Sequence, residues 1–372
     1  MKYYIIAGEA SGDLHGANLM KSIYKEDPQA EIRFWGGDLM QKAGGNLVKH
    51  YRELAFMGFA EVVMNLKTIL GNIKVCKDDI SRFQPDVLIF IDYPGFNMRI
   101  AKWAKKIGIP THYYISPQIW AWKENRISAI KRDVDQMYVI LPFEKDFYEK
   151  KHHFPVEFVG HPLIDAIHDR EHIDEKSFRT EFNLDEKPII ALLPGSRKQE
   201  ISKMLTEMLA VVKDFPEYQF VIAGAPSQEY SFYEQFLNNE NVHFISNRTY
   251  DLLSVSTAAL VTSGTATLET ALFKVPEVVC YKGGWISYQI AKRIITLKYI
   301  SLVNLIMDRE VVTELIQGDC NPKKIKEELH KILMTSKREK VLEEYEILER
   351  KLGGEGASAK TAKLIVNKMK NK

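Results

Sequence analysis

The segment from Ala258 to Leu272 reads AALVTSGTATLETAL and predicts a strand, a turn and a helix in succession. Its apolar start indicates a buried strand, and the residues from Ala266 onward indicate a helix. The small, hydroxyl-rich turn between them leaves backbone N–H groups without partners inside the helix. These groups, together with the positive end of the helix dipole, suit an anion such as a diphosphate. Taken alone, the segment is more typical of an ordinary capped helix.

A second turn of this kind occurs earlier in the chain, where LLPGSR (192–197) follows an apolar run from Ile189. Its arginine can pair with a diphosphate through a forked guanidinium group. Glu269 lies one helical turn after Thr265, near the mouth of the later turn. We therefore predict a nucleotide-diphosphate site formed by Gly195, Ser196, Arg197, Ser263, Gly264, Thr265, Ala266, Thr267 and Glu269.

Length and composition indicate an ordinary globular enzyme. The 372 residues are enough for two α/β domains, and the net charge of +2 does not indicate nucleic acid as a partner. The three cysteines are scattered and do not form a metal-binding pattern. The chain enters a strand at Lys2 without a signal peptide, and no apolar run is long enough to span a bilayer. These features predict a cytoplasmic location.

Strands alternate with helices through both halves, which predicts an α/β fold of two Rossmann-like, doubly wound domains facing across a cleft. The first strand leads into GEASGDLHG (8–16), whose glycine spacing differs from the GxGxxG of dinucleotide folds. This difference disfavours an NAD-dependent oxidoreductase. In this loop Asp13 is expected to cap the helix. Glu9 and His15 are not expected to cap the helix and are therefore candidate catalytic residues.

Asp92 follows a clear buried strand (85–91) and precedes a Pro-Gly turn. A carboxylate at the C-terminal end of a parallel strand lies at the ligand edge of the sheet, where burial can raise its pKa toward that of a general base. Helix capping is the alternative. We place the interdomain linker at Gly160–Leu163, which leaves His161 as a hinge or cleft residue. Residues 302–306 are predicted to form a loop or short strand bearing Asn304, and helices are predicted from there to the C-terminus.

Two regions have features of a membrane-contacting surface. Met57 to Ile80 is helical in period and unusually apolar, with interrupting lysines, and the end of the chain (360–372) carries five lysines and no acid. Core packing and a solvated helix face are the ordinary interpretations. An anionic membrane surface would also suit both regions.

Eight segments carry a specific resemblance. They are GEASGDLHG (8–16), ELAFMGFAEV (53–62), IDYPGFN (91–97), YISPQIWAWKENRI (114–127), LPFEKDFY (141–148), LLPGSRKQEI (192–201), SGTATLE (263–269) and YISLVN (299–304). In this order, across nearly the whole chain, they resemble the lipid-A-disaccharide synthase family of the glycosyltransferase-B fold. The chain departs from the family at Gly95, where relatives have an acidic residue, and at Tyr281–Gly284.

The resemblance implies an inverting, metal-independent glycosyltransferase without a cofactor. Its donor is UDP-2,3-diacylglucosamine, its acceptor is 2,3-diacylglucosamine 1-phosphate, and its products are the β-1,6 disaccharide 1-phosphate of lipid A and UDP. The family's acid corresponds to Asp92, its arginine to Arg197 and its asparagine to Asn304, which joins the predicted UDP site. Glu9 matches the acidic residue of the first loop. We predict Asp92 as the base, with His15 as the second choice.

The resemblance also implies a peripheral enzyme on the cytoplasmic face of the inner membrane, often a dimer. We expect an acceptor domain at 1–164, a UDP-sugar domain at 165–345, and a helical segment at 346–372 that packs back on the first domain or is swapped in a dimer. A UDP-sugar 2-epimerase of the same fold is the main alternative, because it needs the same nucleotide turns. A non-catalytic nucleotide-sugar-binding protein would leave Asp92, Glu9 and His15 unexplained.

Overall fold

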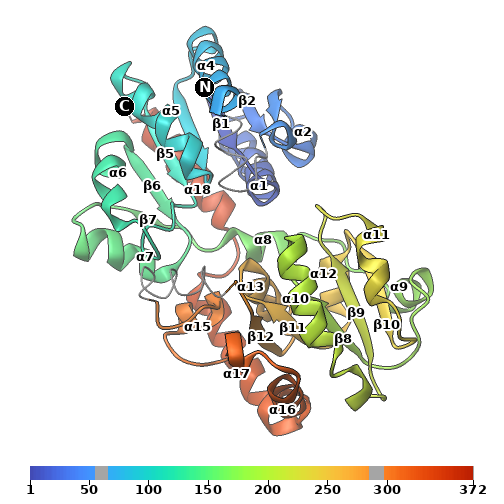
Figure 1. Cartoon of the computed structure of the whole chain (residues 1–372). Helices are drawn as coiled ribbons and strands as arrows, with labels where there is room; N and C mark the ends of the chain where they lie inside the picture. The colour runs from blue at the N-terminus through green and yellow to red at the C-terminus, as the bar shows by residue number, and fades with distance from the viewer. Residues whose placement is uncertain (55–65, 285–296, 372) are drawn as a thin grey trace. The chain divides into compact units, whose positions relative to one another are not determined.

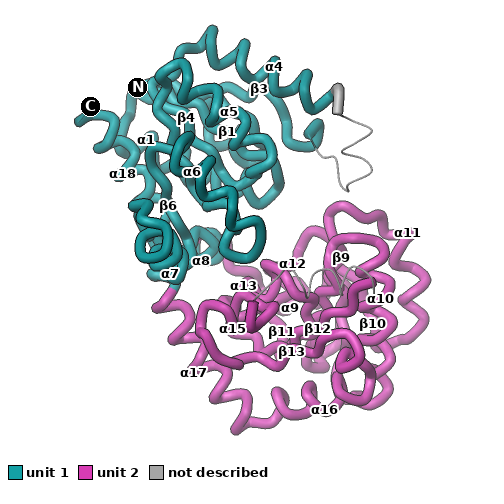
Figure 2. Tube along the Cα trace, turned by 60° about the vertical axis from the view of Figure 1, so that its left-hand side comes forward, with its two compact units in different colours: residues 1–168, 352–372 teal, residues 169–351 magenta. Residues whose placement is uncertain are grey.

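The computed structural model of the chain describes residues 1–54, 66–284 and 297–371. It divides into two compact units (Figure 2). Unit 1 comprises Met1–His168 and Leu352–Lys372, and unit 2 comprises Asp169–Lys351. Each unit is an α/β layer structure around one parallel sheet, as the alternation of strands and helices predicts.

Unit 1 is built on a seven-stranded parallel sheet in the order β3-β2-β1-β4-β5-β6-β7 (Figure 1). Its strands are β1 (Lys2–Ala7), β2 (Glu31–Gly36), β3 (Asn46–His50), β4 (Val87–Ile91), β5 (Thr111–Tyr114), β6 (Gln136–Val139) and β7 (Glu157–Phe158). Its helices are α1 (Ala10–Glu26), α2 (Asp38–Ala43), α4 (Leu66–Phe83), α5 (Pro94–Lys106), α6 (Ile127–Asp133), α7 (Pro142–Asp146), α8 (Pro162–His168) and α18 (Ala357–Lys370).

The central strands of unit 1 are apolar on both faces because helices cover both sides of a parallel sheet. Every residue of β4 is buried, and so is every residue of β1 after Lys2. β1 lies between β2 and β4, with Ala7 opposite Ile91. This register brings the loops that follow β1 and β4 to the same carboxyl edge of the sheet.

The last segment of the chain packs on unit 1. The Asp165 carboxylate in α8 accepts hydrogen bonds from the N–H groups of Gly356 and Ser358, at 2.7 and 2.9 Å, and so holds the start of α18. The His161 N–H donates to the Leu352 carbonyl at 3.0 Å. The Gly-His-Pro stretch is therefore a docking point for the returning chain, and the division between the two units lies after it, between His168 and Asp169.

Unit 2 has a six-stranded parallel sheet in the order β10-β9-β8-β11-β12-β13. Its strands are β8 (Ile189–Leu193), β9 (Gln219–Gly224), β10 (Val242–Ser246), β11 (Ser256–Thr262), β12 (Glu277–Tyr281) and β13 (Thr313–Ile316). Its helices are α9 (Glu175–Glu181), α10 (Lys198–Leu209), α11 (Tyr230–Tyr233), α12 (Thr249–Ser254), α13 (Thr265–Leu272), α15 (Leu302–Met307), α16 (Pro322–Leu333) and α17 (Thr335–Lys351).

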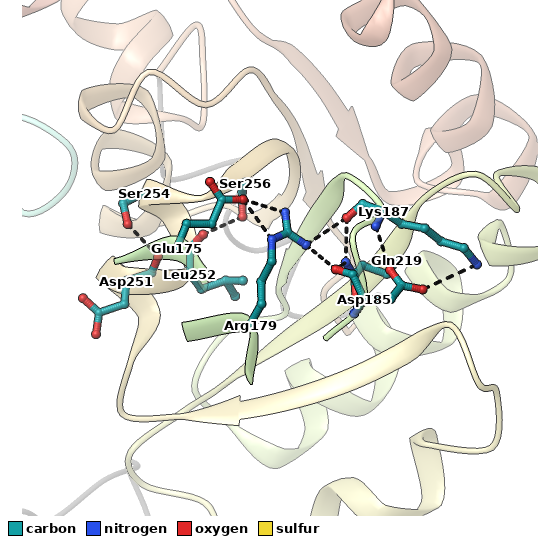
Figure 3. Close-up of polar contacts among 9 residues, drawn as sticks. All are labelled: Glu175, Arg179, Asp185, Lys187, Gln219, Asp251, Leu252, Ser254 and Ser256. Atoms are coloured by element: carbon teal, nitrogen blue, oxygen red, sulfur yellow. Dashed lines mark hydrogen bonds and ion pairs between the residues drawn. The ribbon is translucent and has the colours of Figure 1, made fainter. Parts of the chain in front are cut away.

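A polar cluster fixes the loop that enters β8 (Figure 3). The Arg179 guanidinium, from α9, binds Glu175 and donates to the carbonyls of Asp185 and Lys187. The Gln219 amide, at the start of β9, donates to the same two carbonyls at 2.9 and 2.6 Å. Both carbonyl groups of this loop thus have side-chain donors, and β8 pairs with β9 from Ile189 onward.

The structure corrects two predictions near the end of unit 2. Residues 302–306, predicted as a loop or short strand, belong to helix α15, because the Ser301 hydroxyl accepts the Asn304 N–H and caps its first turn. The region after this helix is not wholly helical, since Thr313–Ile316 adds the edge strand β13 beside β12. Strand β3 was likewise not predicted.

The predicted apolar helix at 57–80 overlaps residues 55–65, which lie outside the described residues; from Leu66 onward it is confirmed as α4. Within the described ranges, none of the helices is both long and apolar enough to cross a membrane.

Candidate active site

The loops after β1 and β4 meet closely in unit 1. A Cβ on Gly8 would lie 2.3 Å from the Tyr93 ring, so only glycine permits this ring to pack against the first loop. Glu9 follows directly as the N-cap of α1, and its side chain is exposed and makes no capping hydrogen bond. The contact between Gly8 and Tyr93 therefore brings the Glu9 loop to the turn that carries Asp92.

Asp92 is held in an unusual backbone conformation. Asp92 and Tyr93 both have positive φ, at 43° and 48°, which is costly for residues with a side chain. The Asp92 carbonyl accepts a hydrogen bond from the Asn97 amide at 2.7 Å and another from the Tyr113 hydroxyl at 2.6 Å. These two bonds go to the carbonyl, whereas the carboxylate, half-buried at the strand end, is bonded by the Tyr93 backbone N–H.

The Asp92 carboxyl has the pKa of a general base. Burial, and then the negative charge of Glu9, raise this pKa from 3.8 to about 6, against a backbone hydrogen bond from Tyr93 that lowers it. A carboxylate with a pKa near 6 is ionised at neutral pH yet accepts a proton more readily than an exposed aspartate. Glu9 and Asp92, which the sequence predicted as catalytic, thus lie close enough to interact.

His15, the second predicted base, lies in a different environment. Its side chain is buried in α1, and burial lowers its pKa to about 4 despite the nearby Asp165. His161 is also buried; burial, and then the neighbouring His15, lower its pKa to about 3. Both imidazoles are therefore neutral at pH 7. His15 and His161 are neighbours, and His15 lies near Asp165, which holds the start of the C-terminal helix α18. The charged group that shifts the pKa of His15 is Asp165 and not Asp92.

Asp13 is a cap, but not of its own helix. Its carboxylate accepts hydrogen bonds from the N–H groups of Gly37, Leu39 and Met40, at 2.7 to 3.0 Å. These groups form the start of α2, so the predicted capping role is correct in kind and wrong in its target. The geometry leaves Glu9 as the exposed acid of this loop.

The two predicted anion turns of unit 2 are neighbours. Strands β8 and β11 pair in parallel, with Leu193 opposite Val261. The turns that follow them, 194–197 and 262–265, therefore leave the sheet side by side at its carboxyl edge, where open α/β sheets bind ligands.

The first turn combines a cation with an occupied N–H group. Gly195 has a φ of +100°, and the Ser196 N–H donates to the Glu200 carboxylate at 3.2 Å. Glu200 lies in the first turn of α10, so its carboxylate occupies an N–H group at the predicted diphosphate position. Arg197 is exposed, and within the part of the chain that the structure describes no carboxylate pairs with it.

The second turn has free donors. The N–H groups of Gly264, Thr265 and Ala266 have no hydrogen-bond acceptor among the described residues. Gly264 is exposed, and a Cβ on it would meet no atom within 4 Å. Thr267 is buried, and both its N–H and its hydroxyl donate to the Gly264 carbonyl. It therefore shapes the turn, whereas the three residues before it offer the open N–H groups.

Glu269 and Asn304 differ in what they can offer a ligand. Glu269 is half-buried, accepts a hydrogen bond from the Tyr250 hydroxyl at 2.8 Å, and has its pKa raised by burial. Asn304 is fully buried, and its amide is occupied on both sides: its NH₂ donates to Val312 and Glu314, and its oxygen accepts from Val311 and Val312. Its geometry is that of a structural residue.

Comparisons with known proteins agree on one family. The family model described as lipid-A-disaccharide synthetase matches residues 3–369. Lipid-A-disaccharide synthase of Syntrophus aciditrophicus is 39% identical over 98% of this chain and 97% of the relative. The enzyme of that name from Coxiella burnetii is 38% identical, with the same coverage. This chain belongs to the lipid-A-disaccharide synthase family. It is a glycosyltransferase of lipid A biosynthesis.

Solved structures share the fold of this synthase family at low identity. A UDP-GlcNAc 2-epimerase from Neisseria meningitidis, bound to UDP-GlcNAc, matches with a TM-score of 0.67 at 15% identity and covers all of both chains. The glycotransferase of kitacinnamycin matches with a TM-score of 0.67 at 13% identity over 98% of each chain. These matches confirm the predicted two-domain Rossmann-like fold. The alternative function, that of a UDP-sugar 2-epimerase, is supported by similarity of fold alone.

Two residues in this region were missed by the sequence reasoning. Glu200 follows Ser196 by four positions, one more than the spacing of a capping box, so no local motif indicated this contact. Tyr250 lies on α12 and has no local motif that would connect it with Glu269. Among the described residues, no group of three or more His, Cys, Asp or Glu side chains could hold a metal ion.

Proposed function

We propose that the chain transfers 2,3-diacylglucosamine from its UDP conjugate to the 6-hydroxyl of 2,3-diacylglucosamine 1-phosphate. The products are the β-1,6-linked disaccharide 1-phosphate and UDP. The observation that carries the proposal is the acid pair of unit 1, where burial and Glu9 raise the pKa of Asp92 to about 6. A base of this strength is suited to a sugar hydroxyl that must lose its proton as it attacks.

The step is a single displacement at the anomeric carbon. Asp92 takes the proton of the 6-hydroxyl, and the oxygen forms a bond to C1 of the donor sugar. The bond between C1 and the diphosphate oxygen breaks, and UDP leaves with the electron pair. Attack opposite the leaving group inverts the configuration. Glu9 supports this role because its charge makes the neighbouring carboxylate a better proton acceptor.

The leaving diphosphate is assigned to the two turns of unit 2. The N–H groups of Gly264, Thr265 and Ala266 are donors for its oxygens, and Arg197, which has no carboxylate partner among the described residues, supplies the positive charge. Because one exposed helix end contributes only about 0.3–1 kcal/mol, the proposal requires these donors to act together with the guanidinium. Gly195, Ser196, Ser263 and Thr267 shape the turns. Glu269 is proposed to contact the nucleotide.

The test incubates the purified chain with both substrates in the presence of EDTA and follows products by mass spectrometry and UDP release. Disaccharide 1-phosphate with stoichiometric UDP supports the transfer and its expected independence from a metal ion. UDP release without disaccharide points to hydrolysis or to epimerase-like chemistry and rejects the acceptor. Activity that is lost with EDTA and returns with Mg²⁺ rejects the metal-independent part.

We also propose that the enzyme works as a peripheral protein on the cytoplasmic face of the inner membrane. Helix α4 exposes about half of Leu70 and Val75, beside the exposed Lys74, and the exposed lysines of α18 add positive charge. Flotation with vesicles containing anionic lipid tests this: Leu70→Glu with Val75→Glu should reduce binding, and unchanged binding rejects this surface. The proposed homodimer is tested by light scattering, where a monomer mass rejects it.

A further inference from the structure

The carboxylate of Glu314 is the centre of a hydrogen-bond network in unit 2. It lies on β13 and is half-buried. One oxygen accepts from the Ile300 N–H at 2.9 Å. The other accepts from the Ser301 N–H at 2.9 Å, the Ser301 hydroxyl at 2.8 Å and the Asn304 amide at 2.9 Å. One side chain thus fixes the backbone and both polar side chains of residues 300–304.

This network continues to the turn that we assign to the diphosphate. The Ser263 hydroxyl donates to the Ile300 carbonyl at 2.8 Å, and the Ser263 N–H donates to Cys280 at 3.2 Å. Ser263 immediately precedes Gly264, Thr265 and Ala266, whose N–H groups are open. The position of these donors therefore depends on Ile300, and the position of Ile300 depends on Glu314.

The donors around Glu314 are all neutral. Within the described ranges no lysine, arginine or histidine pairs with its carboxylate, so its negative charge is stabilised by two N–H groups, a hydroxyl and an amide alone. A carboxylate in this setting can only accept hydrogen bonds. Asn304 cannot replace it, because its own amide is already bonded on both sides.

We infer that Glu314 is a positioning residue for UDP-sugar binding, which acts through Ile300 and Ser263 on the open N–H groups of the second turn. The inference rests on the proposed function only in assigning the diphosphate to that turn. In this inference Asn304 supports the network through its hydrogen bonds and does not itself contact UDP. A network that merely stabilises unit 2 is the competing explanation.

The experiment measures UDP affinity by calorimetry for the wild-type chain, for Glu314→Ala, Glu314→Gln and Ser263→Ala, and for the double variant Ser263→Ala/Glu314→Ala, with the melting temperature of each. Glu314→Ala is expected to weaken UDP binding at least about tenfold, which corresponds to about 1.4 kcal/mol. Glu314→Gln should weaken it less, because one acceptor oxygen remains. Since Ser263 acts through the same path, Ser263→Ala should add little to Glu314→Ala. Steady-state kinetics should show a raised KM for the donor and an unchanged KM for the acceptor.

Thr313→Val is the matched control. Thr313 precedes Glu314 on the same strand, but its hydroxyl donates to Glu328 at 3.0 Å. This variant is expected to lower the melting temperature without changing UDP affinity. If Glu314→Ala does not fold, Glu314→Gln carries the test.

The outcomes separate this inference from the proposed function. Unchanged UDP affinity in folded Glu314 variants overturns the inference and leaves the function standing. Additive effects of the Ser263 and Glu314 substitutions also overturn it, because they mean separate actions. The expected pattern of UDP affinities in an enzyme that forms no disaccharide supports the inference and rejects the function. A wild-type chain that does not bind UDP overturns both.

Discussion

Replacing Asp92 by asparagine should abolish most activity and stabilise the fold at the same time. Asparagine keeps the shape and the backbone contacts of the site but cannot accept the hydroxyl proton. General bases contribute roughly 10²- to 10⁴-fold in rate, and we expect a loss of this size in kcat/KM. At 1.36 kcal/mol for each factor of ten, this loss amounts to about 3–5 kcal/mol of transition-state stabilisation.

The gain in stability follows from the pKa. Folding raises the pKa of Asp92 from 3.8 to about 6, so keeping this group ionised costs the native state about 3 kcal/mol at 1.36 kcal/mol per pKa unit. For an acid whose pKa is raised by folding, stability is lost as the pH rises through the interval from 3.8 to about 6. Asparagine is neutral throughout, so the advantage of the variant should grow over this interval and be complete at pH 7.

The assay measures kcat/KM as a function of pH and the free energy of unfolding in urea at pH 4.5 and pH 7. Wild-type kcat/KM should fall on the acid side with an apparent pKa near 6. Glu9→Gln should lower the apparent pKa of this fall in kcat/KM. The apparent pKa should not reach 3.8, since burial is the larger cause of the shift. Asp86→Asn is the control, because Asp86 is an exposed carboxylate just before the same strand. Full activity of folded Asp92→Asn would refute the assignment of the base. A variant that is less stable at pH 7 would refute the argument from burial.

Three further predictions concern single side chains. Arg197→Ala should raise the barrier for transfer by about 2–4 kcal/mol while the acceptor KM stays constant, as measured by steady-state kinetics; an unchanged rate removes Arg197 from the leaving-group site. Asp13→Ala leaves three N–H groups of α2 without their acceptor and should lower the free energy of unfolding by about 1–3 kcal/mol in urea, with UDP affinity preserved. Glu144→Gln replaces one carboxylate oxygen by an amide NH₂, which faces two of the four donors that now bind the buried carboxylate, so a loss of about 1–3 kcal/mol is expected in the same assay, and a neutral result contradicts the network.

The sequence predicted those parts of the molecule whose signals are local. Continuous apolar runs identified β1, β4, β8 and β11, because strands buried on both faces need them. A small turn between such a run and a helix identified both anion turns, and the register of β8 with β11 confirms that they are neighbours. The edge strands β3 and β13 were missed because each is short and only partly buried, which weakens the apolar pattern.

Side-chain partners that are distant in the sequence could not be predicted. Asp13 was expected to cap α1, yet it caps α2, since the choice depends on how two helices pack. Asn304 was expected to contact the nucleotide, and its amide is instead bonded to Val311, Val312 and Glu314. A motif shows that an asparagine is needed at a position, but its contacts decide whether it binds a ligand or supports the residues that do.

The Asp92 turn illustrates how a fold maintains a costly site. Its two residues of positive φ and its raised pKa all oppose folding, and contacts from separate strands and helices hold the turn in place. Asn97 in α5 and Tyr113 in β5 bind the Asp92 carbonyl, and Gly8 after β1 provides the space for the Tyr93 ring. Because three separate elements hold the turn, the carboxylate needs no side-chain hydrogen bond among the described residues; the adjacent Tyr93 backbone N–H bonds to it and lowers its pKa. The carboxylate therefore remains free to accept a proton from a substrate, which is the property that a general base requires.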